Sequence, residues 1–190
     1  MKVSREQASK NRERIVEVAG QLFCERGFDG IGVADLMKAA GLTHGGFYGH
    51  FGCKDDLVAE ACRKALARGA QRWTALAKNS RGAPLAAIAG NYLTEAHRDH
   101  PGKGCLFAAL GSDAARQSQP VRDVFTEGLG ELIEILAEAS PGRSRAQKRK
   151  AALAVMAQMV GAIVLARLVD DDALSRDLIE ASAQAISAVP

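Results

Sequence analysis

A helix–break–helix pattern over residues 33–54 constrains the fold of this chain more than any other segment. Apolar residues recur at helical spacing before the break, which Gly41 marks. Glycine is the residue best suited to the left-handed conformation that ends a helix. Thr43 can cap a second short helix, whose aromatic residues are Phe47, Tyr48 and Phe51. Two helices joined by such a turn predict a helix-turn-helix, whose second helix usually enters the DNA major groove.

The composition favours a compact helical protein. The 190 residues suffice for one unit or for two small helical domains that share a core. Hydrophobic residues make up 47%, which argues against disorder, and aromatic residues make up only 5%, which favours helices over sheets. The formal net charge of +3 is too small to indicate a nucleic-acid partner by itself.

The sequence predicts a cytoplasmic protein with no membrane partner. The N-terminus is charged and lacks the apolar core of a signal peptide. The most apolar stretch, 151–169, is interrupted by Gln158, Gly161 and Arg167, so we expect no membrane-spanning helix. The four cysteines show no CxxC spacing, which predicts reduced thiols, and Cys24 and Cys62 are expected in the core.

Basic residues gather at the N-terminus, at Lys2, Arg5, Lys10, Arg12 and Arg14. This segment could be an arm that follows DNA phosphates or reaches a minor groove. The alternative is a frayed, solvated tail, and the sequence does not decide between the two.

Hydrophobic periodicity and helix-breaking residues predict nine helices. Their expected ranges are 9–26, 33–40, 43–51, 54–79, 84–95, 105–117, 120–139, 144–168 and 173–188. Phe28 lies between the first two and is expected to fill the small core among the first three helices. Residues 97–104 are rich in Pro and Gly and are expected to form a loop.

An ordered set of residues in the N-terminal third resembles the tetracycline-repressor (TetR) family of bacterial transcription regulators. The matching residues are Arg14-Ile15, Ala19, Leu22-Phe23, Gly27-Phe28, Val33, Ala40-Gly41-Leu42-Thr43, Gly45, Phe47-Tyr48, His50-Phe51, Lys54 and Leu57. The resemblance implies an all-α, nine-helix, two-domain fold. Residues 1–53 would form a three-helix DNA-binding domain, and residues 54–190 a ligand-binding domain that dimerises through its last two helices.

Candidate DNA contacts follow from this segment. Thr43 and His44 open the recognition helix, where side chains usually meet base edges, and Gly45 and Gly46 suggest close backbone approach to DNA. The resemblance implies phosphate or sugar contacts by Tyr48, His50 and Lys54. Lys38 and the helix-capping Gly32 complete the expected set. The alternative is that the aromatic residues are core, which we accept for Phe47 and Phe51.

Three residues depart from the family pattern. Met37 stands where a small residue is usual, so the two helices could cross differently. Gly46 replaces a frequent Ser or Thr, which leaves base readout to few side chains and increases reliance on DNA shape. Cys53 replaces a Ser cap before Lys54, which predicts a weaker helix start.

Cys105 is the candidate sensor outside this unit. It starts a helix, and Gly104-Cys105-Leu106 followed by Ala108-Ala109-Leu110 resembles a subgroup with Gly-Cys at this point. A helix N-terminus and nearby cations, here expected from His97, His100 and Lys103, favour a reactive thiolate. The alternative is a small buried apolar residue. His97, Asp99, His100 and Cys105 make a weak metal pattern, and we predict no metal and no cofactor.

An effector pocket is expected between the C-terminal helices. Its candidate lining residues are Trp73, Tyr92, Phe107, Phe125, Met156 and Met159. Ordinary core packing is the alternative for each of them.

The sequence therefore predicts a ligand- or redox-responsive transcription regulator, a homodimeric repressor that binds a palindromic double-stranded DNA operator. A small-molecule or electrophile inducer would release it. A thiol enzyme using Cys105 is a second reading, but no oxyanion hole or ordered triad is recognisable. A carrier with a degenerate DNA unit is a third, and the intact spacing from Arg14 to Lys54 argues against it.

Overall fold

The computed structural model describes residues 4–188, and all regular elements in that range are helical. The α-helices are α1 (Arg5–Arg26), α2 (Val33–Ala39), α3 (Lys54–Lys78), α4 (Pro84–Tyr92), α5 (Glu95–Asp99), α6 (Leu106–Ala114), α7 (Gln119–Ala139), α8 (Arg145–Leu168) and α9 (Asp172–Ser187). Two 3-10 helices are η1 (His44–Gly49) and η2 (Pro101–Lys103). The prediction of an all-α fold is confirmed.

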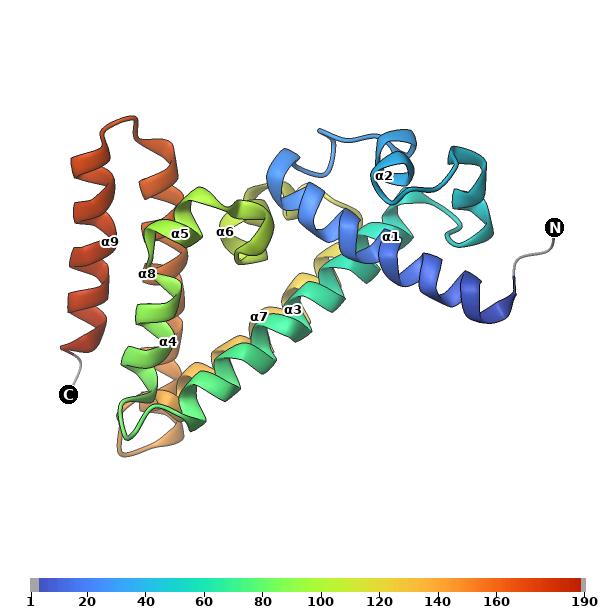
Figure 1. The fold of residues 1–190 in the computed structure, drawn as a ribbon. Coiled ribbons are helices and arrows are strands. Elements are labelled where there is room, and N and C mark those ends of the chain that lie inside the picture. Colours follow the sequence, from blue (N-terminus) through green and yellow to red (C-terminus); the bar gives the residue numbers. More distant parts are fainter. Residues whose placement is uncertain (1–3, 189–190) are drawn as a thin grey trace.

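The helices form two ends joined by a long pair (Figure 1). α1, α2 and η1 make a head at one end, while α4, α8 and α9 lie at the other. α3 and α7 run side by side between them and pack against each other along their length. One continuous helix, α3, therefore connects the head to the far end of the molecule.

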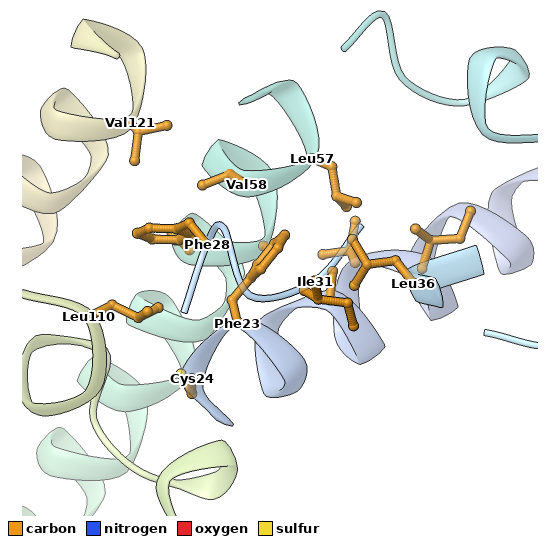
Figure 2. Close-up of a cluster of buried hydrophobic side chains, with 14 of the residues drawn as sticks. Phe23, Cys24, Phe28, Ile31, Leu36, Leu57, Val58, Leu110 and Val121 are labelled. Atoms are coloured by element: carbon orange, nitrogen blue, oxygen red, sulfur yellow. The ribbon is translucent and has the colours of Figure 1, made fainter. Parts of the chain in front are cut away.

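Phe28 joins the head to the rest of the molecule (Figure 2). Its side chain is only 1% exposed, and its ring centroid lies 5.5 Å from that of Phe23 in α1 and 6.4 Å from that of Phe125 in α7. The head core also includes Leu57 and Val58 of α3. The expected boundary between residues 53 and 54 therefore crosses a shared core, and the division into two domains stays a prediction.

The N-terminal basic segment is helical where the structure describes it. Ser4 caps α1 by accepting a hydrogen bond from the Gln7 N–H at 3.1 Å, so α1 begins at Arg5 rather than near residue 9. This result replaces the frayed tail over that range, because a cap and the following turns satisfy the backbone. That the basic segment contacts DNA stays a prediction. Lys2 lies outside the described residues.

The expected loop over residues 97–104 contains two short helices. Thr94 ends the preceding segment and caps α5, because its hydroxyl accepts from the His97 N–H at 3.1 Å. Pro101 then opens η2, where its missing N–H leaves no donor unpaired. Pro and Gly usually interrupt helices, whereas here they mark the start and end of short helical turns.

α8 is long and apolar enough to cross a membrane, contrary to the sequence expectation. Arg167 lies in its last turn, so a long apolar stretch precedes it. In the folded chain, however, α8 packs against α7, α9 and α6, and residues such as Met159 and Ile163 are fully buried. We therefore interpret α8 as a core helix of the C-terminal bundle.

Candidate functional site

The recognition segment is a 3-10 helix rather than the expected α-helix. Three of the six residues of η1 are glycines, which favour the helix least apart from proline. Thr43 occupies the cap position, but its side chain makes no capping hydrogen bond, which corrects the expected role. Its carbonyl instead accepts from the Gly46 N–H at 3.0 Å, a short-range bond typical of a 3-10 turn.

η1 presents one polar face and one buried aromatic face. Phe47 and Phe51 are buried in the head core with stacked rings whose centroids are 5.5 Å apart. Tyr48 points outward with 68% exposure. Its ring is nearly perpendicular to that of His44, with the two ring centroids 6.4 Å apart. Thr43 is also exposed. The candidate base-reading residues thus lie on the surface beside an exposed tyrosine.

The glycines of η1 differ in their surroundings. A Cβ atom at Gly45 or Gly49 would meet nothing within 4 Å, so both leave open backbone on the outer face. A Cβ atom at Gly46 would lie 3.6 Å from the end of the Met37 side chain. Met37 is fully buried, so the unusually large residue in α2 fills space beside an unusually small one in η1. At that distance a Cβ atom would make only ordinary van der Waals contact with Met37, so the packing of Met37 does not by itself require glycine at position 46.

Arg12 holds η1 against α1 and α3. Its guanidinium donates to the His50 carbonyl and to the Glu60 carboxylate, and its central carbon lies 4.2 Å above the Phe51 ring. Arg14 likewise donates to the Ala40 carbonyl at 3.2 Å, at the end of α2. The sequence left these arginines either in a DNA-following arm or in a solvated tail, whereas in the structure they position the helix-turn-helix.

The remaining candidate contacts lie around η1. Gly32 and Lys38 are exposed at the start and end of α2. The Lys54 ammonium donates to the Phe28 carbonyl at 2.5 Å, so this lysine ties α3 to the loop after α1. Asp56 stabilises the start of α3, which the sequence predicted to be weak. Its carboxylate accepts a hydrogen bond from the Cys53 N–H at 3.2 Å.

Cys105 lies beside a neutral histidine. The His97 ring hydrogen-bonds the Tyr92 carbonyl through Nδ1 at 2.8 Å and accepts from the Cys105 N–H through Nε2 at 2.9 Å. Nδ1 therefore carries the proton, and burial lowers the pKa of His97 to about 4, helped by the positive charges of Arg167 and Arg72. His97 thus adds no positive charge near Cys105, contrary to the sequence expectation.

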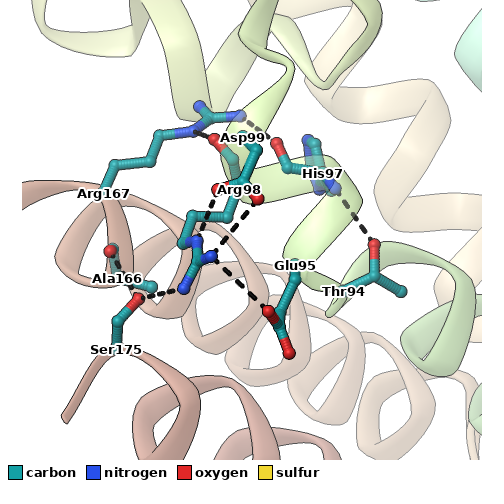
Figure 3. A network of polar contacts seen from close by, with 8 residues as sticks. All are labelled: Thr94, Glu95, His97, Arg98, Asp99, Ala166, Arg167 and Ser175. Atoms are coloured by element: carbon teal, nitrogen blue, oxygen red, sulfur yellow. Dashed lines mark hydrogen bonds and ion pairs between the residues drawn. The ribbon is translucent and has the colours of Figure 1, made fainter. Parts of the chain in front are cut away.

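Arg167 supplies that positive charge instead (Figure 3). It reaches from α8 and donates to the carbonyls of His97 at 2.5 Å, Arg98 at 2.9 Å and Ala108 at 3.2 Å. Burial lowers its pKa, while nearby Tyr92 and Cys105 oppose that change. Sequence reasoning missed this residue, although an arginine near the end of an apolar helix was a usable signal.

One hollow is lined by Cys105, and a second lies beside the first. A small cavity of about 30 Å³ is lined by Ala65, Leu66, Gly69, Arg72, Trp73, Tyr92, Gly104, Cys105, Leu106 and Leu132. A surface cleft of about 380 Å³ is lined by Arg72, Asn91, Thr94, Ala96, His97, His100 and Lys103. We call them the inner cavity and the outer cleft. Arg72 borders both, so they are neighbours on the same side of α3.

Comparison with known proteins identifies the family. The family model described as bacterial regulatory proteins of the tetR family matches residues 15–61, which cover α2, η1, the second half of α1 and the start of α3. The chain belongs to the TetR family. TetR-family proteins are transcription regulators and not enzymes, so the reading of Cys105 as an enzymatic nucleophile is rejected.

Individual TetR-family relatives support this assignment. The transcriptional repressor NemR of Escherichia coli is 28% identical over 131 residues, which are 67% of this chain and 66% of NemR, just under two thirds of that relative. The repressor DhaR of a Mycobacterium species is 28% identical over 111 residues, covering 58% of this chain and 56% of DhaR.

Solved TetR-family structures share the fold over nearly the whole chain. The reduced form of E. coli NemR has a TM-score of 0.79 at 24% identity and covers 95% of this chain and 98% of that chain. A TetR-family regulator from Cytophaga hutchinsonii has a TM-score of 0.78 at 22% identity, covering 100% and 98%.

Only some of the residues expected to line the effector pocket of this TetR-family chain lie at one cavity. Trp73, Tyr92 and Cys105 line the inner cavity. Phe107 and Phe125 instead contact each other at 5.4 Å between the ring centroids, toward the head core. Met156 and Met159 are buried in the core of the C-terminal bundle. Spacing along helices could not separate these groups, because all six positions face the interior. Among residues 4–188, no group of three or more His, Cys, Asp or Glu side chains could hold a metal ion.

The buried state of His97 predicts a pH-dependent stability. Its pKa is about 6.5 when unfolded and about 4 when folded, so stability is complete above pH 6.5 and falls as pH drops toward 4, where the unfolded chain binds the proton first. Between pH 7.5 and 5 we expect a loss of about 2 kcal/mol from this group. Urea unfolding at both pH values measures it. His97→Gln should lack this part of the loss, and an equal loss in variant and wild type would contradict the assignment.

Proposed function

We propose that this TetR-family chain is a homodimeric repressor that acts in the cytoplasm, binds operator DNA through its head and releases the DNA in response to an effector at Cys105. The observation that carries the proposal is η1, whose Phe47 and Phe51 are buried while Tyr48 and His44 are exposed together. The Tyr48 ring packs on Phe47 at 5.3 Å between centroids, which orients it, and its exposed ring and hydroxyl suit a DNA backbone.

The head would read DNA with few side chains. Thr43 and His44 stand at the exposed start of η1 and would meet base edges, while Tyr48, His50 and Lys38 would contact phosphates. Gly45 and Gly49 allow the backbone to approach the groove closely. Specificity would therefore depend in part on DNA shape.

An exposed apolar surface on α8 and α9 supports a homodimer. We call this surface the C-terminal face; its large exposed residues are Leu153, Val164, Leu165, Leu168 and Leu174. Leu168 is 76% exposed, although α8 also contributes fully buried residues to the bundle. Large apolar side chains exposed on two neighbouring helices indicate an interface, and two-fold pairing is the commonest solution for identical chains.

Release would pass from the effector region to the head by direct contact. η2, which carries Lys103 of the outer cleft, packs on α1, and α6, which follows Cys105, also contacts α1. A Cβ atom at Gly102 would collide with Gln21 and Glu25 of α1, so the two segments touch closely. An effector shifts this arrangement only if it binds the DNA-free state more tightly.

The surroundings of the four thiols favour Cys105 as the reactive one. Burial raises the pKa of Cys24 and of Cys62 to about 12, which keeps both protonated and unreactive. Cys105 is half-buried at the inner cavity, and Cys53 is exposed at the start of α3. The Cys105 sulfur would add to a ring carbon of an electrophile such as a quinone. The thiol proton would go to one ring oxygen, and the hydrogen of the attacked carbon would move to the other, which gives a hydroquinone thioether.

A gel shift with the DNA that flanks the protein's own gene tests the proposal. We expect a specific complex whose log affinity falls linearly with log salt, by about 0.9 for each phosphate neutralised. Binding equal to that of scrambled DNA of the same length at every salt concentration would contradict the proposal. It would favour the alternative of a ligand carrier whose head no longer reads DNA.

A further inference from the structure

The Tyr92 hydroxyl is a buried donor without a partner. Tyr92 is 2% exposed, and among the described residues its hydroxyl oxygen makes no hydrogen bond. The ring is fixed by Trp73, with centroids 5.9 Å apart, and by His97 at 4.4 Å, so the hydroxyl cannot swing out to solvent. Leaving such a group unpaired costs about 1–3 kcal/mol, and a ligand that supplies an acceptor recovers it.

Tyr92 lines the inner cavity together with Cys105, and its hydroxyl lies next to the Cys105 thiol. Burial, with the neighbouring Cys105 thiol, raises the pKa of Tyr92 well above its ordinary value, so the group remains a donor. The cavity volume of about 30 Å³ suits one water-sized group. The lining also includes the apolar side chains of Leu66, Trp73 and Leu132, and Arg72 is its one charged member. The space thus fits a single acceptor oxygen of a ligand whose remaining atoms lie outside the inner cavity.

The outer cleft has the opposite chemistry. Its lining contains the cations Arg72 and Lys103, both exposed, and it contains no carboxylate. Within residues 4–188 neither side chain has an ion-pair partner. His100 adds a third basic side chain at the rim. Unpaired cations around a concave surface attract a small anion.

We infer that the inner cavity and outer cleft form one effector site for a small oxo-carboxylate. Its carbonyl oxygen accepts a hydrogen bond from Tyr92, and its carboxylate pairs with Arg72 and Lys103. The ligand binds without a covalent bond and covers the Cys105 thiol. The consequence for DNA release rests on the proposed function, whereas the binding itself does not.

Two analogues, each lacking one of the two groups, measure the hydrogen bond and the ion pair separately. The probes are ketoisocaproate, which has both groups, isocaproate, which lacks the carbonyl, and the methyl ester of ketoisocaproate, which lacks the charge. We expect ketoisocaproate to bind about tenfold tighter than either analogue, since a buried hydrogen bond and an ion pair are each worth about that factor. Calorimetry measures affinity, and Trp73, the single tryptophan of the chain, reports occupation of the cavity by fluorescence.

Substitutions then assign the contacts. Tyr92→Phe should weaken ketoisocaproate about tenfold and leave isocaproate unchanged, and it should not lower the melting temperature because the hydroxyl has no partner to lose. Arg72→Gln should weaken both acids but not the ester. Arg63→Gln, another exposed arginine on α3, is the matched control and should bind like wild type.

The outcomes separate this inference from the proposed function. In a Cys53→Ser background, saturating ketoisocaproate should slow benzoquinone addition to Cys105 severalfold. Equal affinity for all three probes, no binding of ketoisocaproate, or unchanged binding by Tyr92→Phe would overturn the inference while leaving operator binding intact. Binding as described, with no operator complex in the gel shift, would keep the site and reject the repressor.

Discussion

Replacing His44 and Tyr48 together by alanine is expected to lower operator affinity by at least about a hundredfold. A good side-chain contact to DNA is worth about 1–3 kcal/mol, and a symmetric dimer loses each contact twice. Both side chains are exposed on η1, so their removal leaves the buried core of the head unchanged. Fluorescence anisotropy with labelled operator DNA measures the loss.

Two controls make this result specific to the DNA surface. Light scattering should give the same mass for the double variant and the wild type. Tyr48→Phe keeps the ring and removes only the hydroxyl, so it should weaken binding less than Tyr48→Ala. If His44→Ala and Tyr48→Ala each bound the operator like wild type, η1 would not be the reading element.

The C-terminal face gives the second large expected effect. Introducing aspartate at Leu165 and Leu168 places four charges in the interface of a dimer, where two-fold symmetry brings like charges together. We expect a monomer of 20.1 kDa and a loss of operator affinity of roughly a hundredfold or more, since each chain then binds only one half-site.

Sedimentation velocity distinguishes this outcome from unfolding. Ala67→Asp, an exposed position on α3 away from the C-terminal face, is the matched control and should remain dimeric. A wild-type chain that sediments as a monomer at micromolar concentration would contradict the assignment of the C-terminal face. So would a double variant that remains a dimer.

The sequence predicted the helix-turn-helix because its signals are local. Gly41 adopts a φ of 71°, as a glycine after a helix should, and Phe28 fills the core among the helices that flank it. Phe47 and Phe51 could be placed in the core because aromatic residues at helical spacing are buried together. These features depend on residues close together in the chain.

Features that depend on distant residues could not be predicted. Arg12 donates a hydrogen bond to Glu60, 48 positions later in the chain. Arg167 donates to the carbonyl of His97, 70 positions earlier. Tyr92 and Cys105 were separate candidates, and only the fold places both at the inner cavity. The 3-10 geometry of η1 also escaped prediction, because three glycines leave the backbone free to follow the packing of Met37 and Phe47.

The most direct test of the account is operator release by benzoquinone, measured by anisotropy for wild type, Cys105→Ser and Cys53→Ser. The account predicts that wild type and Cys53→Ser release the DNA, while Cys105→Ser stays bound at the same dose. The exposed Cys53 in the head is the only other thiol among residues 4–188 that is not deeply buried, which makes its variant the matched control. Release of Cys105→Ser to the same extent as wild type would contradict the account.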